Sequence, residues 1–311
     1  MNLLFRAAVA VFVLAFTAPA LGAELQFPPG SRIGLVPPDG FVVSRNFLGF
    51  DGKAGAILAV TELAGESYAR LAREFTAEGV RSSGLELVSR EELTLPGGPA
   101  VIVAARHQVS GVPMRQWALS ALFGDIALVV MLTMPEDSRV TYPDAAVRAM
   151  FGTVSVRPKL AQPDLLAVLP YRLDDLAGFR VLRVTPNGMA SLTFGASDTP
   201  LPVEQPYFMV VTQTLRPPAT EHQNFARSAF AQLTGRTTRV VSEEAIRIGG
   251  DPGYQIVGES KDERTGDDLV VVVWLRFGLT GTVQMAGFAR KDRWDEILPR
   301  MRAIRDGWAA R

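Results

Sequence analysis

Alternating hydrophobic and polar positions occur along this chain in two similar series. In each half, four such segments follow one another with only short breaks between them, and this pattern is typical of antiparallel strands joined by tight turns. The breaks carry turn residues such as Pro96-Gly97 and Gly249-Gly250. The predicted strands are 86–95, 100–108, 115–123 and 126–133 in the first half, and 238–248, 254–261, 269–277 and 282–288 in the second.

Each series of four strands is framed by further elements in the same order. Shorter alternating segments come first, then a helix with one apolar face, and a second such helix closes the half. Asp51-Gly52 and Asn187-Gly188 are predicted hairpin turns, and Ser67 and Thr220 are predicted helix N-caps. The early strands are 41–47 and 56–61, then 179–184, 189–194 and 208–214; the helices are 67–78, 142–151, one that begins at 220 and one that begins near 292.

A short sequence repeat supports a tandem duplication. Val88-Ser89-Arg90-Glu91 returns as Val241-Ser242-Glu243-Glu244, at an offset of 153 residues. The early strands are spaced differently, because Phe41 and Thr61 are 20 steps apart whereas Phe179 and Thr212 are 33 apart. The extra residues are predicted to form a loop over 198–206 and an added hairpin.

The fold class that follows is α+β, with two tandem α/β/α sandwich domains, each a central antiparallel sheet flanked by helices. The predicted ranges are a signal peptide at 1–23, domain 1 at 31–158, a linker at 159–168 and domain 2 at 169–308. Two linked copies should also create a cleft that neither copy has alone.

The first residues predict export. Arg6 precedes a short apolar run that ends in small residues, which is the pattern of a secretory signal peptide. Cleavage after Ala20 and cleavage after Ala23 both fit. The run is shorter than the ~20 apolar residues that a membrane span needs. Ala23 stands where a lipoprotein would carry its lipidated cysteine, so we expect a soluble periplasmic protein without a stable membrane anchor after cleavage.

Composition excludes several functions. The chain has no cysteine, which excludes disulfides and thiolate metal sites. It carries 32 basic and 32 acidic residues, so it lacks the positive field of a nucleic-acid-binding protein. With only two histidines, His107 and His222, and no closely spaced ligand set, a metal site is not expected.

Candidate catalytic residues are few. His107 is predicted to be solvated on a strand, and His222 to be exposed in the first turn of a helix. No nucleophile elbow or phosphate-binding loop is present, and the nearest serine candidate, Ser67, reads as a helix cap. Glu91-Glu92 and Glu243-Glu244 recur in both halves, but adjacent strand residues point to opposite faces and cannot converge on one atom. The four tryptophans, including Trp308 near the end, are assigned to packing.

The order of elements in each half, with Pro38-Asp39-Gly40-Phe41 near the start and an apolar closing helix, resembles the PsbP-like superfamily. The resemblance covers nearly all of the mature chain as two units. It implies a role in binding other proteins and assigns no site residue.

The sequence therefore predicts an exported, non-enzymatic binding or protein-interaction module, with another periplasmic or envelope protein as its partner. No catalytic, cofactor-binding or metal-binding residue is assigned, and no cofactor is expected. Two alternatives stay open. A small-molecule carrier would have a closed apolar pocket of several hundred Å³. A hydrolase that uses only Ser, Asp, Glu or Lys would gather carboxylates of raised pKa in a deep cleft.

Overall fold

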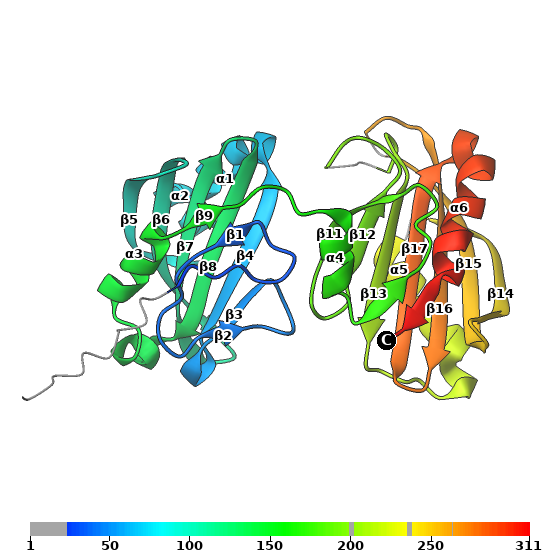
Figure 1. Ribbon diagram of the computed structural model, residues 1–311, viewed down its shortest axis with the longest axis horizontal. Coiled ribbons are helices and arrows are strands. Elements are labelled where there is room, and N and C mark those ends of the chain that lie inside the picture. Colours follow the sequence, from blue (N-terminus) through cyan, green and yellow to red (C-terminus); the bar gives the residue numbers. More distant parts are fainter. Residues whose placement is uncertain (1–23, 199–201, 235–237, 263) are drawn as a thin grey trace, which may run out of the picture.

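The computed structural model describes residues 24–198, 202–234, 238–262 and 264–311, and these form two sheet-based domains joined by one segment (Figure 1). Each domain is built on a seven-stranded antiparallel sheet flanked by helices. The predicted fold class, two tandem α+β sandwiches, is confirmed.

The two sheets have the same strand order. Each contains the predicted four-strand meander, with three earlier strands added beside its last strand. The first sheet runs β2 (Val42–Val43), β3 (Gly49–Asp51), β4 (Ile57–Ala64), β8 (Ile126–Pro135), β7 (Val112–Phe123), β6 (Gly98–Val109) and β5 (Glu86–Leu95). The second runs β11 (Arg180–Val184), β12 (Ala190–Thr193), β13 (Tyr207–Gln213), β17 (Gly281–Arg290), β16 (Asp268–Gly278), β15 (Asp251–Lys261) and β14 (Arg239–Ile248).

The repeated Val-Ser-x-Glu segment marks the same β-bulge in both domains. Val88 is skipped in the pairing of β5 with β6, and Val241 is skipped in the pairing of β14 with β15. A bulge inserts one unpaired residue into an edge strand and twists that edge away from its neighbours. Both valines are exposed, so the repeat preserves a backbone feature rather than a core contact.

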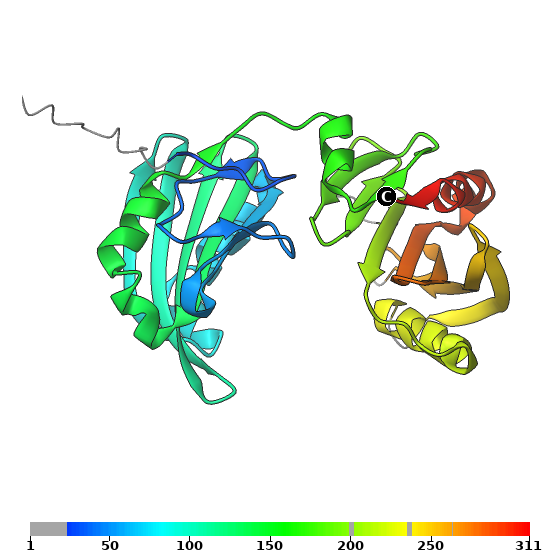
Figure 2. The same ribbon diagram turned by 60° about the horizontal axis from the view of Figure 1, so that its bottom comes forward.

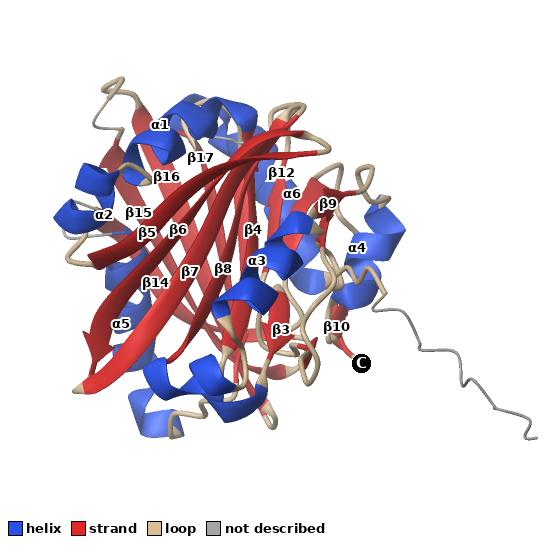
Figure 3. Ribbon diagram, turned by 90° about the vertical axis from the view of Figure 1, so that its left-hand side faces the viewer, coloured by secondary structure: helices blue, strands red, loops and turns tan. Residues whose placement is uncertain are grey.

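Helices cover both faces of each sheet. In the first domain, α3 (Asp144–Gly152) lies across one face, and α1 (Tyr68–Glu74) and α2 (Ala77–Ser82) lie on the other (Figure 3). In the second, α6 (Trp294–Asp306) and α5 (His222–Thr234) lie on opposite faces (Figure 2). Each face has its own apolar core; Trp117 and Trp274 are the largest fully buried side chains.

A two-stranded sheet closes each domain in an equivalent way. β1 (Ile33–Gly34) pairs with β9 (Ser155–Val156), and β10 (Tyr171–Leu173) pairs with β18 (Trp308–Ala310). In each domain the strand before the large sheet thus pairs with the strand after the closing helix. Trp308 packs against the second core, as expected, but it lies in β18 rather than in the last helix.

The helix predicted over 67–78 is wrong in its extent. The structure has two short helices, because the Thr76 hydroxyl accepts a hydrogen bond from the Gly79 amide at 3.0 Å and caps a new helix. A Cβ at Gly79 would lie 2.3 Å from the Arg73 carbonyl oxygen, so this glycine permits close packing of the two helices. Ser67 and Thr220 lie at short 3-10 turns, and Ser67 makes no side-chain capping bond.

The early strands of domain 1 also differ from expectation. The segment 41–47 is not one strand, because β2 and β3 are separate and very short. Both domains therefore have three early strands, and the expected added hairpin in domain 2 is wrong; its early strands β11 and β12 are longer instead. The expected loop at 198–206 contains residues 199–201, which lie outside the described residues.

The predicted linker contains regular structure. Helix α4 (Gln162–Val168) lies within it, and Leu165 packs into the core of the second domain. Helix α6 is continuous and contains Pro299 in its interior.

The predicted signal peptide, residues 1–23, lies outside the described residues. Among the residues described, none of the helices combines the length and apolar character that a membrane crossing needs.

Candidate functional site

A cleft of about 470 Å³ lies where the two domains meet. Its walls come from the segment before β1, from β4, from the segment before α4, and from β11, β12 and β13. The lining residues are Gly30, Ser31, Arg32, Leu48, Val60, Glu62, Leu63, Ala64, Ser67, Asp125, Ile126, Lys159, Leu160, Leu165, Leu182, Arg183, Met189, Ser191, Asp198 and Tyr207. The cleft that was expected from the duplication is present.

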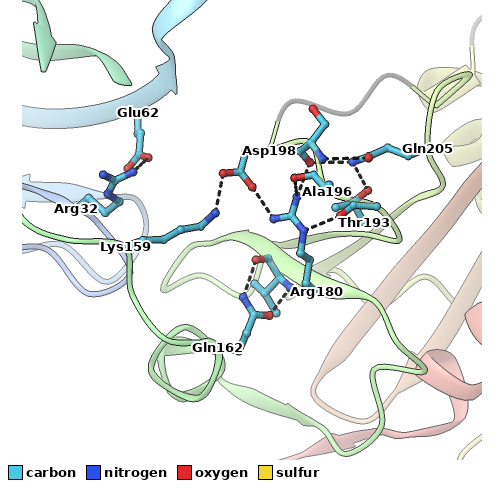
Figure 4. Close-up of polar contacts among 12 residues, drawn as sticks. Arg32, Glu62, Lys159, Gln162, Arg180, Thr193, Ala196, Asp198 and Gln205 are labelled. Atoms are coloured by element: carbon cyan, nitrogen blue, oxygen red, sulfur yellow. Dashed lines mark hydrogen bonds and ion pairs between the residues drawn. The ribbon is translucent and has the colours of Figure 1, made fainter. Parts of the chain in front are cut away.

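The wall formed by domain 1 is organised by Arg32. Its Nη1 donates to the Glu62 carboxylate at 3.1 Å (Figure 4). Its Nη2 lies 3.9 Å from Asp125. The Arg32 Nε also donates to the Arg157 carbonyl, at 3.3 Å. These bonds hold Arg32 and the Glu62 carboxylate in a fixed geometry beside the cleft.

The opposite rim is organised by Asp198, which joins the linker to domain 2. Its carboxylate accepts from Lys159 Nζ at 2.6 Å and from Arg180 Nη1 at 2.5 Å (Figure 4). Burial favours a higher pKa for Asp198, but the hydrogen bonds and charges of Lys159 and Arg180 outweigh it and lower the pKa below its ordinary value. The carboxylate is therefore charged at neutral pH, and these ion pairs are lost as the pH falls through the lowered pKa.

Two strand edges meet at the cleft. The Arg183 Nη2 of β11 donates to the backbone carbonyl of Glu62 on β4, at 2.5 Å, and this bond joins the two domains. The Gln162 side chain, at the start of α4, bonds to Val181 of β11. It donates to the Val181 carbonyl at 3.0 Å and accepts from the Val181 amide at 2.6 Å (Figure 4). One glutamine amide thus makes the two hydrogen bonds that a neighbouring strand would make.

The chemical candidates named from the sequence do not gather at this site. Ser67 lines the cleft, but neither histidine does. His107 lies on β6, and His222 is only half-buried rather than exposed; its ring stacks on Phe277 with 3.6 Å between centroids. The expectation of an exposed His222 is wrong, because the aromatic ring covers one of its faces.

The paired glutamates point apart, as predicted. Glu91 pairs with Arg148 of α3 at 2.7 Å, whereas Glu92 pairs with its neighbour Arg90. In domain 2, Glu243 pairs with Arg227 of α5, and Glu244 accepts from Gln255 at 2.8 Å. Each carboxylate serves a separate structural contact. Within the described ranges, no group of three or more histidines, aspartates or glutamates is placed to hold a metal ion.

The cleft was predictable from the two-domain sequence, but its binding residues were not. Arg183 and Glu62 are 121 positions apart, and no local pattern indicates that they touch. Gln162 falls in a segment that was interpreted as linker, where its bonding to a strand edge has no sequence signal.

Comparisons with known proteins identify no family. No protein-family profile matches the chain, and no curated protein matches it in sequence. Among solved structures, an immunity protein of the type VI secretion system from Pseudomonas aeruginosa aligns over 92% of this chain and 97% of its own, at 12% identity and a TM-score of 0.34. A cyanobacterial PsbP protein from Synechocystis aligns over 46% of this chain and 99% of its own, at 14% identity and a TM-score of 0.31. These alignments do not assign the chain to the PsbP-like superfamily.

Proposed function

We propose that this chain is an exported, non-enzymatic protein-interaction module and that the cleft between its domains is the binding site. The partner is another periplasmic or envelope protein. Export rests on the signal-like pattern of residues 1–23.

The single observation that carries the proposal is the construction of the cleft. Two copies of one fold contribute opposite walls, so the site exists only in the two-domain chain. Six of its lining residues are charged: Arg32, Glu62, Asp125, Lys159, Arg183 and Asp198. A lining of charged and apolar residues together suits a protein interface, whereas pockets for small molecules are mostly apolar.

The polar groups of the cleft favour binding over catalysis. A nucleophile needs an adjacent base that is itself oriented by a third group. Ser67 has no histidine beside it in the cleft lining. Asp198 has a lowered pKa, which is the opposite of what a general acid requires.

A photocrosslinking experiment tests this function. A benzophenone amino acid at Met189, which lines the cleft, is expected to give a discrete adduct with one envelope protein in native host cells. The matched control is Val140, which is 90% exposed and lies outside the cleft. N-terminal sequencing of the purified adduct should show that this chain starts directly after Ala20 or Ala23. Equal labelling from both positions, or no adduct from Met189, would reject the proposed site.

A further inference from the structure

We propose that the cleft binds an extended, carboxylate-bearing segment of the partner, which adds as a strand to the free edge of β4. This inference rests on the proposed function, because it specifies how the cleft engages a protein partner. Strand addition is an established way for a sheet edge to bind an extended peptide, with main-chain hydrogen bonds providing much of the affinity.

The outer half of β4 has an open edge. β8 pairs with β4 over its whole length, whereas β3 pairs with it only over Ile57, Leu58 and Ala59. The last bond on the β3 side runs from the Val60 amide to the Leu48 carbonyl at 2.9 Å. No strand of the described residues pairs with the following residues on that side.

The direction of the free backbone groups follows from strand geometry. Alternate residues of an antiparallel strand direct their N–H and C=O groups to the same side. Because the Val60 amide points toward β3, the backbone groups of Glu62 and the amide of Ala64 point to the open edge. Both residues line the cleft.

Arg183 already satisfies one of these groups. Its guanidinium donates to the Glu62 carbonyl at 2.5 Å, where the amide of an added strand would donate. Arg183 is exposed, and no ion pair with a carboxylate joins it among the residues described. Displacing it would free a guanidinium inside the cleft, and guanidinium groups form strong bidentate hydrogen bonds with carboxylates. The backbone of an added segment would pair with Glu62 on β4, and an Asp or Glu side chain of that segment would bind the displaced Arg183.

The facing edge, on β11, is closed by contrast. Gln162 occupies the amide and carbonyl of Val181. Gly30 lies so close to Val184 that a Cβ there would be 2.9 Å from the valine side chain. The backbone groups of this part of β11 are therefore occupied, and an incoming segment would pair with the edge of β4 instead.

The chain itself suggests a variant that closes the edge of β4. Ala64 has φ −62° and ψ 146°, which a proline can adopt, and in domain 2 the equivalent residue at the start of the 3-10 turn is Pro218, with φ −61° and ψ 152°. Ala64→Pro removes an N–H that faces the open edge and leaves the pairing with β8 intact. Ala77→Pro is the matched control, because Ala77 is the first residue of α2, where proline is tolerated, and lies outside the cleft.

The experiment uses a displayed library of random eight-residue peptides selected on the full chain. We expect enriched peptides to contain Asp or Glu and to lack proline at their centre. As synthetic peptides, they should bind Ala64→Pro about fivefold or more weakly than the unmodified chain, the effect of one lost hydrogen bond. Ala77→Pro should bind as the unmodified chain does. Arg183→Gln should reduce the difference in affinity between an acidic peptide and its amide counterpart.

The inference would be overturned by the absence of enriched peptides or by equal binding to Ala64→Pro. Dimerisation of the chain that Ala64→Pro abolishes would also overturn it, because that result would assign the edge to a second copy. A crosslinked partner whose affinity Ala64→Pro leaves unchanged would also reject strand addition, while the proposed function of the cleft would stand.

Discussion

Replacing Trp274 with alanine is expected to reduce the free energy of unfolding of the second domain by about 4 kcal/mol. The side chain is fully buried between β16 and α6. Its indole N–H donates to the Gln255 side chain at 2.6 Å, so truncation removes a large apolar group and leaves a buried amide oxygen without its donor. Hydrogen exchange of β15 and β16 in increasing urea measures this loss separately from domain 1.

The matched control for this variant is Trp294→Ala, at a tryptophan that is only partly buried against the same core. Its effect should be clearly smaller. A loss below about 1 kcal/mol for Trp274→Ala would contradict the assignment of this residue as a core anchor.

Removing the carboxylate of Asp144 is expected to destabilise the first domain by about 3 kcal/mol, because the buried Arg115 loses its hydrogen-bonded carboxylate and keeps only the more distant Glu136. Arg115 is only 2% exposed on β7, and its Nη2 donates to Asp144 at 3.1 Å. The next carboxylate, on Glu136, is 3.6 Å from Nη1 and makes no hydrogen bond with it. Urea denaturation followed by hydrogen exchange in β7 measures the change for Asp144→Ala.

The control is Asp137→Ala, at an exposed aspartate in the 3-10 turn Glu136–Val140, which precedes α3. It should change stability by no more than about 0.5 kcal/mol. Replacing Arg115 itself by methionine should cost less than Asp144→Ala, because it removes the buried charge together with its need for a partner. The reverse order would show that the pair is not desolvated.

The four-strand meanders were predictable because each hairpin is encoded locally. Strand alternation and turns such as Gly249-Gly250, where both residues have positive φ, specify the connections without distant contacts. The duplication was also visible, and the structure explains why: the repeated segment holds the bulged Val88 and Val241, which the backbone geometry of both edge strands retains.

The errors occur where neighbouring structure decides the outcome. The helical periodicity of 67–78 is genuine, but the capping bond of Thr76 divides it into two helices. β2 and β3 are too short for alternation to reveal. β3 forms by pairing with β4, and β2 forms by pairing with β3. Trp308 follows the last helix in the sequence, but it lies in a strand and pairs with Leu173, which is 135 positions earlier.

The candidate site was the least predictable part, because its contacts depend on how two domains meet. Arg183 is an ordinary polar residue of a predicted strand, and its role follows only from the carbonyl of Glu62 on the other domain. Gln162 likewise acquires its role from the position of α4 beside β11.

Obstruction of the cleft tests most directly whether partner binding occurs there. Because the chain has no cysteine, Met189→Cys and Val140→Cys each carry a unique thiol that a bulky maleimide can modify. The affinity for the crosslinked partner is then measured before and after modification, with circular dichroism to confirm that the fold is retained. Modification at residue 189 is expected to weaken binding at least about tenfold, a loss of about 1.4 kcal/mol, whereas modification at residue 140 should leave it unchanged. Undiminished binding with the adduct at residue 189 would show that the partner binds elsewhere.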